Sequence, residues 1–117
     1  MAWFRVDDQL HGHPKARQAG LAAMGLWSLA GSYSASYGLA GDVPAHYVAG
    51  WPNGRKLAQA LVACGLWETT ENGWRFHDWD DYQPSADEIE EARAAARRRQ
   101  REHRQKLRSQ RDNQETK

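Results

Sequence analysis

The sequence predicts a mainly α fold of the α+β kind, in which helices are closed by a small β-hairpin and followed by a long basic helix. An apolar helix stops at Gly65, and two short strands follow around an Asn72-Gly73 turn. The composition then breaks at Pro84, after which Ser85 opens a charged helix. A helix that leads directly into a two-stranded hairpin is the way a winged helix-turn-helix domain ends, and its helix is the one most often laid in a DNA major groove.

Length and charge divide the chain into two parts. The 117 residues suffice for one domain, and we predict a winged-helix domain over residues 1–84. A basic C-terminal helix, frayed or disordered toward its end, is predicted over residues 85–117. Residues 1–84 hold six Lys and Arg against eight Asp and Glu, whereas residues 93–111 hold nine against one. A basic tail of this kind binds nucleic acid or is simply solvated.

The N-terminal part of the chain predicts a brief strand followed by two helices. Residues 3–6 are bulky and predict a brief strand. Pro14 suits the first position of a helix that runs to about residue 20. A second helix is predicted over residues 21–37, with a wide apolar face made of Met24, Leu26, Trp27, Leu29, Ala30, Tyr33 and Ser34.

The middle of the chain predicts a turn, a short strand and two more helices. Val43 lends a brief strand after the turn at residues 38–42, and Pro44 starts a helix to about Ala49. Asn53 is a candidate N-cap for a helix over residues 54–63. The apolar face of that helix comprises Leu57, Ala58, Leu61, Val62 and Cys64. The residues expected to be outward or lateral are Arg55, Lys56, Gln59, Ala60 and Ala63.

The closing hairpin is predicted from residues 66–69 and 74–79. Asn72-Gly73 between them is among the best dipeptides for a type I′ turn. Most tryptophans are assigned to the core, namely Trp3, Trp27, Trp67, Trp74 and Trp79. Trp51, in the turn beside Pro52, is expected to be exposed. The lone cysteine allows no internal disulfide, and it is interpreted as a small core residue.

The tail opens with a capping box, because Ser85 can accept a hydrogen bond from the third helical amide and Glu88 can reach back. Acidic residues fill the first turns and arginines follow, which suits the helix macrodipole. We expect a helix from Ser85 to Gln105 or beyond. Large apolar residues are few, and Ile89, Ala92, Ala96 and Arg99 do not sustain a heptad. A stable coiled coil is therefore not expected without a partner.

Two basic groups are the candidates for DNA binding. Arg55, Lys56 and Gln59 share the outer face of the helix before the hairpin, where a cation meets phosphate or guanine and Gln59 pairs with adenine. An ordinary solvated helix face is the alternative. The tail bases are the stronger electrostatic candidates, because neutralising phosphates releases counterions with little need for sequence specificity. They are Arg93, Arg97, Arg98, Arg99, Arg101, Arg104, Lys106, Arg108 and Arg111, and they cover most of the helix circumference.

The hairpin itself carries the wrong charge for a wing that grips phosphate. Glu71 lies at its expected tip and Glu68 is near, while Arg75 is its only base. Like charges repel at short range, so the helix and the tail must supply DNA affinity. Glu71 and the exposed Trp51 are instead candidates for contact with a protein partner.

Other function classes find little support. His11, His13, His46 and His77 form no metal-ligand spacing, so neither a metal nor a cofactor is expected. Asp78, Asp80 and Asp81 lack a nucleophile or base in fixed relation, which argues against an enzyme. The chain has no apolar stretch long enough for a membrane span and no signal peptide, and we expect a cytoplasmic protein.

Several segments resemble one family. Trp3-Phe-Arg-Val-Asp-Asp, His11-Gly-His-Pro-Lys, Met24-Gly-Leu-Trp, Gly65-Leu-Trp-Glu and the closing run Trp74-Arg-Phe-His-Asp-Trp-Asp-Asp-Tyr-Gln are similar to the N-terminal winged-helix domain of phage replisome-organiser and DnaD-like primosomal proteins. The short versions of actinobacterial phages and mobile elements are especially similar. The resemblance spans residues 3–83, and its most specific piece is Phe76-His-Asp-Trp with Tyr82-Gln83.

The resemblance implies origin binding or helicase loading, together with self-association. Here a basic helix replaces the second globular domain of full-length relatives. This difference favours plain DNA binding, regulation or accessory recombination over helicase loading. We therefore expect a DNA-binding protein of a phage or mobile element, acting in replication initiation or its regulation. One alternative is a protein-interaction module that recruits or inhibits a host replication or transcription factor. Another is an accessory recombination (directionality) factor. DNA, a host replication protein and a second copy are the partners considered.

Overall fold

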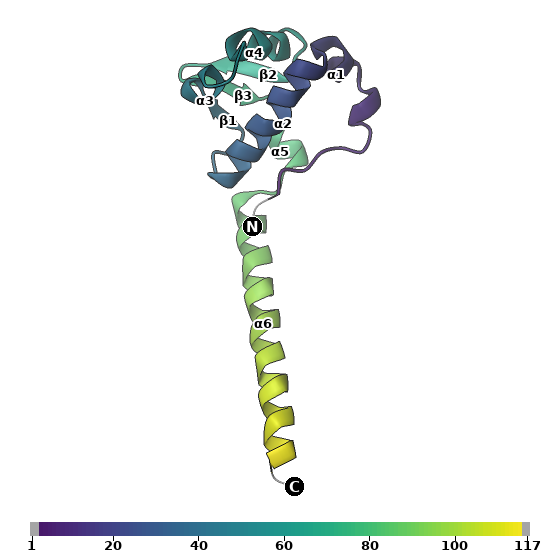
Figure 1. Ribbon diagram of the computed structural model, residues 1–117, viewed down its shortest axis with the longest axis vertical. Helices are drawn as coiled ribbons and strands as arrows, with labels where there is room; N and C mark the ends of the chain where they lie inside the picture. The colour runs from purple at the N-terminus through teal and green to yellow at the C-terminus, as the bar shows by residue number, and fades with distance from the viewer. Residues whose placement is uncertain (1–2, 116–117) are drawn as a thin grey trace. The chain divides into compact units, whose positions relative to one another are not determined.

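The computed structural model describes the backbone of residues 3–115 and the side chains of residues 3–112. The chain forms two compact units, residues 1–83 and residues 84–117 (Figure 1). A mainly helical fold with a small antiparallel sheet and a long C-terminal helix is confirmed. The fraying predicted toward the C-terminus falls partly on residues 116–117, which lie outside the described residues.

The first unit alternates short helices with three strands. Its elements are η1 (Leu10–Gly12), α1 (Pro14–Ala19), α2 (Leu21–Ser36), β1 (Asp42–Pro44), α3 (Ala45–Ala49), α4 (Gly54–Ala63), β2 (Trp67–Thr70), β3 (Gly73–Phe76) and α5 (Trp79–Tyr82). The four helices predicted over residues 14–63 are present within one residue at each end. The 3-10 turn η1 and the helix α5 had no counterpart in the sequence prediction.

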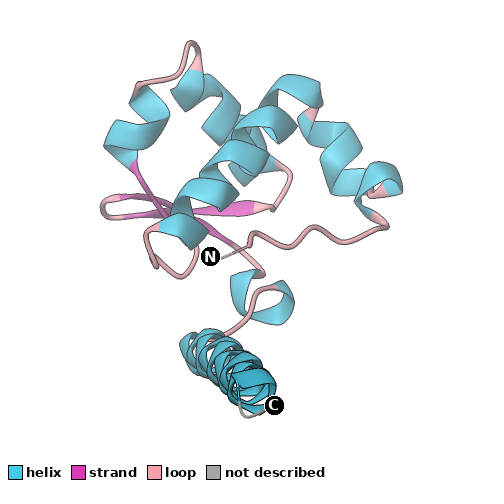
Figure 2. Ribbon diagram, turned by 60° about the horizontal axis from the view of Figure 1, so that its bottom comes forward, coloured by secondary structure: helices cyan, strands magenta, loops and turns pink. Residues whose placement is uncertain are grey.

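The sheet has the order β1-β3-β2, and both pairs are antiparallel. The helices α2, α3 and α4 lie on one side of it (Figure 2). Side chains on the helix side include the cross-strand pair Trp67 and Phe76, and Val43. The other side presents a row of charge, because Arg75 in the central strand pairs with Asp42 of β1 and with Glu68 of β2. The sheet therefore has one apolar face and one charged face.

The core of the first unit is built mainly from α2, α4 and the sheet. Leu61, Ala30 and Val48 are fully buried. Phe4, Trp27, Phe76 and Trp79 form an aromatic cluster, with neighbouring ring centroids 5.0–5.8 Å apart. Such edge and offset contacts add to the apolar area that the rings bury.

The assignment of tryptophans to the core is partly correct. Trp27, Trp67 and Trp79 are buried, as predicted, and Trp74 is half-buried. Trp3 is wrongly assigned, because 74% of its surface is exposed. Its neighbour Phe4 enters the aromatic cluster in its place.

The strand predicted over residues 3–6 is absent, and these residues form a loop. A side chain takes the place of a neighbouring strand. The backbone N–H of Arg5 donates to Oε1 of Gln83 at 2.9 Å, and Nε2 of Gln83 donates to the carbonyl of Arg5 at 2.8 Å. The amide of Gln83 thus offers the donor and acceptor that a strand residue would offer, at a single position. Phe4 fixes the same loop, since its ring lies against Gly31.

The predicted type I′ turn at Asn72-Gly73 is also wrong. The turn residues are Glu71 and Asn72, and Gly73 is the first residue of β3, paired with Thr70. Asn72 does not have the positive φ that a type I′ turn requires. Gly73 is needed for a different reason. A Cβ there would lie 2.3 Å from the carbonyl oxygen of Val43, because β1 packs directly against this position.

Two further predictions fail at helix ends and faces. Asn53 precedes α4 but makes no capping hydrogen bond with its side chain, because its backbone is left-handed (φ 58°). A cap side chain needs an extended backbone to reach the helix amides. On α2, Leu29 was placed in the apolar face, yet it is 45% exposed. The buried face of α2 is centred instead on Ala23, Trp27, Ala30 and Ser34.

The second strand of the hairpin is shorter than predicted. It ends at Phe76, and Trp79 begins the helix α5. The indole of Trp79 packs on Gly41, where an added Cβ would lie 2.8 Å from the Trp79 Cβ. Trp79 is buried in this way from a helix and not from a strand. It is also out of phase with the alternation of Trp74 and Phe76.

The second unit is the helix α6 (Ala86–Glu115), which reaches well past the predicted minimum at Gln105. Ser85 caps it, because its Oγ accepts a hydrogen bond from the Glu88 amide at 3.1 Å. Asp87 and Glu88 occupy the first turn, where negative charge complements the helix dipole.

Candidate nucleic-acid interface

The outer face of α4 carries the predicted DNA-binding residues. Arg55, Lys56 and Gln59 are all exposed. The opposite face is anchored by Ala58 and Leu61, both fully buried. Of the two alanines expected to be outward or lateral, Ala63 is exposed and Ala60 is half-buried. The three polar side chains therefore share a surface that rests on a rigid, core-packed helix.

The turn before α4 is tightly constrained. Asn53 adopts a left-handed conformation, and Gly54 is buried so close to α3 that a Cβ would lie 1.9 Å from the carbonyl oxygen of Val48. Trp51 in this turn is 42% exposed, as predicted, and its ring meets Tyr47 edge-on with centroids 6.3 Å apart. The close approach of Gly54 to Val48 therefore packs the start of α4 directly against α3.

The charge at the start of α4 opposes the helix dipole. Its first turn contains Arg55 and Lys56 and no acidic residue. The N-terminus of a helix carries partial positive charge, so cations there are unfavourable by roughly 0.3–1 kcal/mol each. In α6 the same position holds Asp87 and Glu88. An anion at the start of α4 would relieve this repulsion, and phosphate is an anion that helix N-termini bind.

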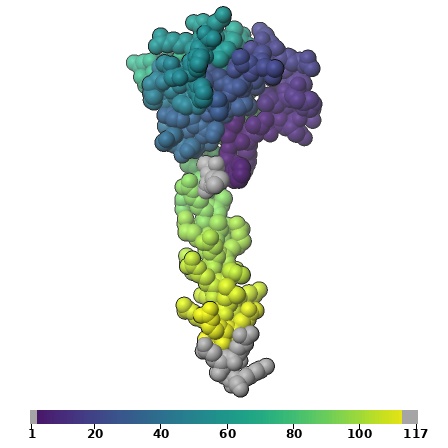
Figure 3. All heavy atoms as spheres, in the orientation of Figure 1, coloured from purple at the N-terminus to yellow at the C-terminus, as the bar shows by residue number. Residues whose placement is uncertain are grey.

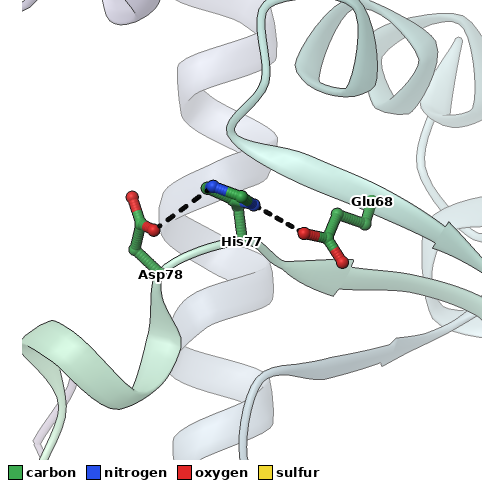
Figure 4. A network of polar contacts seen from close by, with 3 residues as sticks. All are labelled: Glu68, His77 and Asp78. Carbon is green, nitrogen blue, oxygen red and sulfur yellow. Dashed lines mark hydrogen bonds and ion pairs between the residues drawn. The ribbon is translucent and has the colours of Figure 1, made fainter.

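The hairpin is acidic on its outer side. Glu71 is exposed in the turn between β2 and β3. Figure 4 shows His77 between two carboxylates, with Nδ1 at 2.5 Å from Glu68 and Nε2 at 3.5 Å from Asp78. These groups are about half exposed, so each contact contributes little to stability. The arrangement holds the Glu68 carboxylate on the strand and leaves Glu71 alone at the tip.

All nine predicted tail bases are exposed on α6. One of them is partly neutralised, because Nη2 of Arg97 lies 3.0 Å from Oε1 of Glu90. This pair joins residues two helical turns apart, on the same side of the helix.

Three further histidines of the first unit have polar partners. Nδ1 of His13 accepts from the Lys15 amide and caps α1, while Nδ1 of His11 lies 3.0 Å from the carbonyl oxygen of Asp8. His46 lies 3.5 Å from the hydroxyl of Tyr33. Among the described residues, no three His, Cys, Asp or Glu side chains are grouped as a metal site would require. Between residues 3 and 115, each helix is too short or too polar to cross a membrane.

A small cavity lies in the first unit under the N-terminal loop. Its walls include Phe4, Trp27 and Trp79, and Lys15 and Asp78 also line it. The cavity measures about 80 Å³. Small-molecule sites usually measure ~300–1,000 Å³, so this cavity is too small for an organic ligand.

An uncharged surface on α2 and α3 was not foreseen from the sequence. All 16 residues of α2 are described, and none is charged. Leu21 is 94% exposed, Leu29 45% and Tyr37 69%. Tyr33 stacks on Tyr47 of α3 at a centroid distance of 4.1 Å, so the surface continues to Trp51 through Tyr47. The absence of charge over residues 18–41 was the signal that could have revealed it.

No protein-family model, curated protein or solved structure matches this chain.

Proposed function

We propose that residues 1–83 form a winged helix-turn-helix domain and that the chain binds DNA. The proposal rests on one observation above others. The helix α4, which directly precedes the hairpin β2–β3, exposes Arg55 and Lys56 in a first turn that has no acidic residue, and it exposes Gln59 one turn later. Two further contacts support the proposal: α3 packs against α4, and β1 pairs with strand β3 of the hairpin. In this assignment α3 and α4 are the helix-turn-helix pair.

The DNA contacts divide between the two units. We assign base readout to α4, because a basic helix set on a rigid core can enter the major groove. We assign general phosphate affinity to α6, because it carries nine exposed bases. The acidic hairpin contributes little to this binding.

The biological role proposed is replication initiation, or its regulation, in a phage or mobile element. It rests on the resemblance of residues 3–83 to replisome-organiser and DnaD-like domains. The nine exposed bases of α6 support DNA binding as the activity behind this role.

A test of base readout uses the full chain and a duplex selected by it from a random pool. Gln59→Ala should cost about 1–3 kcal/mol on the selected duplex and little on random duplex. Gln18→Ala, an exposed glutamine of α1, is the control and should affect neither. Equal losses on both duplexes would make Gln59 a phosphate contact only, and no loss on either would remove α4 from the interface.

A second candidate function is protein interaction, and the uncharged surface of α2 and α3 favours it. Exposed aromatic and aliphatic side chains without charge are typical of protein interfaces. Trp51 stands at one end of this surface, and tryptophan is enriched at interface hot spots. The partner in this interpretation is a host replication or transcription factor.

This alternative is tested by retention from an actinobacterial lysate treated with nuclease. A partner that survives nuclease should be lost with Trp51→Ala. The matched control is Trp3→Ala, which removes a more exposed tryptophan from the N-terminal loop and should retain the partner. Loss of all partners on nuclease treatment would leave DNA binding as the sole function.

A further inference from the structure

The bases of α6 are unevenly arranged around the helix. An α-helix turns about 100° per residue, so residues three or four apart lie on the same side. The nine bases reach most of the circumference, but six of them recur at spacings of three or four and fall within an arc of about 80°. We call these six the arginine stripe: Arg93, Arg97, Arg101, Arg104, Arg108 and Arg111.

The other faces of α6 differ sharply from the stripe. Beside it lies a second arc of about 80° that holds no Lys, Arg, Asp or Glu among the described side chains. Its residues are Ile89, Ala92, Ala96, Gln100, His103, Leu107 and Gln110. The remaining bases, Arg98, Arg99 and Lys106, lie outside the stripe. Glu102 lies on the side away from the stripe, and it is the one acid between residues 93 and 111.

The stripe is accessible and regular in the structure. All six arginines are exposed on one continuous helix, and Figure 3 shows side chains projecting from the coloured part of α6. The ion pair between Arg97 and Glu90 is direct evidence that side chains on this face reach one another along the axis. The stripe covers 18 residue steps, or about 27 Å at 1.5 Å per residue. That length is most of one turn of duplex DNA, about 34 Å.

Resting on the proposed DNA binding, we propose that α6 contacts duplex DNA through the arginine stripe alone, along one line of phosphates. Insertion into the major groove is the opposing geometry. That groove is about 12 Å wide and a helix with side chains is 10–12 Å across, so an inserted helix has phosphates on both flanks. With the stripe toward the bases, one flank would set the uncharged arc, including Ile89 and Leu107, against phosphates. A single phosphate line avoids this mismatch.

The test compares two triple variants of the full chain that remove the same charge from different faces. The stripe variant is Arg101→Gln, Arg104→Gln and Arg108→Gln. The control variant is Arg98→Gln, Arg99→Gln and Lys106→Gln. Glutamine is a good helix former, and circular dichroism checks that α6 persists in both. Binding to a labelled random-sequence duplex is measured from 50 to 200 mM salt.

The stripe variant should lose at least tenfold in affinity at 50 mM salt. Its plot of log affinity against log salt should become less steep by about 3, since each lost phosphate contact reduces the magnitude of the slope by about 0.9. The control variant should lose less than about threefold and keep its slope. Equal losses in the two variants would overturn one-sided contact and leave DNA binding intact. Absence of salt-dependent binding by the unmodified chain would instead overturn the proposed function.

A second comparison tests the same face with acidic residues. Glu90 lies within the arc of the stripe and pairs with Arg97, whereas Glu91 points about 100° away. Glu90→Gln should raise duplex affinity about two- to fivefold, because it frees Arg97 for phosphate. Glu91→Gln makes the same charge change and should raise affinity by less than half as much. Equal gains would show that net charge, and not the face, governs binding.

Discussion

Glu71 is the side chain at which this hairpin departs most from a DNA-binding wing. It is exposed in the turn between β2 and β3. The carboxylate of Glu68, on the neighbouring strand, lies 2.5 Å from Nδ1 of His77, so its charge is partly engaged. If the hairpin approaches DNA, the phosphates meet Glu71 first.

We predict that Glu71→Lys raises DNA affinity, because it replaces a repelled charge by an attracted one. The gain should be about 0.5–1 kcal/mol at low salt, since the site is exposed and screened. Titration of labelled duplex at two salt concentrations measures it. Asp8→Lys, the same charge change in the N-terminal loop, is the control for net charge and should gain less. An unchanged affinity would mean that the hairpin does not face DNA, and a lower one would assign Glu71 to a protein contact.

Single residues also show where the sequence was ambiguous. The exposure of Arg55, Lys56, Gln59 and Trp51 was predictable from helical periodicity and turn composition. The role of Gln83 was not, because its two hydrogen bonds reach Arg5, 78 positions away. No local pattern encodes such a contact.

At the scale of elements, the sheet depends on the close approach of β1 to Gly73 of β3. The sequence prediction had placed this glycine in the hairpin turn. The dipeptide Asn72-Gly73 is typical of a hairpin turn, but Gly73 lies in β3 and pairs with Pro44 of β1. Its φ of 152° and the nearby backbone of Val43 and Ala45 leave no room for a side chain. Helix positions could be predicted because periodicity is local. The need for a glycine at position 73 could not, because it comes from β1, which lies about 30 residues earlier in the chain.

Gly73→Ala should therefore destabilise the first unit by on the order of 2–4 kcal/mol, through backbone strain and displacement of β1. Gly25→Ala is the matched control, since Gly25 lies on the exposed face of α2 with nothing within 4 Å of an added Cβ. It should stabilise the unit by about 0.5–1 kcal/mol, because alanine favours the helix. Urea unfolding of both variants measures the difference. A neutral Gly73→Ala would contradict the packing of β1 on β3.

The first turn of α4 predicts opposite effects on stability and on DNA binding. Lys56→Glu should raise the free energy of unfolding by about 0.3–1 kcal/mol, because an acid complements the helix dipole. The same change should weaken duplex binding, because it repels phosphate. Lys56→Gln is the control for loss of charge and should fall between the unmodified chain and Lys56→Glu in both measurements. A gain in stability with unchanged binding would place α4 outside the interface.

In the whole molecule, the buried core and most of the positive charge lie in different units. Residues 1–83 close around a core of their own, in which α2, α4 and the sheet supply the buried side chains. Residues 84–117 supply most of the positive charge on one helix, whose described side chains are largely exposed. The break in composition at Pro84 made this division predictable. The uneven arrangement of arginines on α6 required a helix of known extent, because a face exists only where the helix is continuous.

Removal of residues 86–117 should consequently leave folding intact and reduce DNA affinity. The shortened chain keeps the buried cluster of Trp27, Leu61 and Trp67, so it should melt cooperatively. Affinity for random duplex should fall about tenfold or more at low salt, with a shallower salt slope, because the contacts that release counterions are lost. Gln59→Ala should still lower the affinity of the shortened chain for a selected duplex, since base readout is assigned to α4. If the shortened chain binds random duplex as tightly as the full chain, α6 is a solvated helix and the DNA-binding charge resides in the first unit.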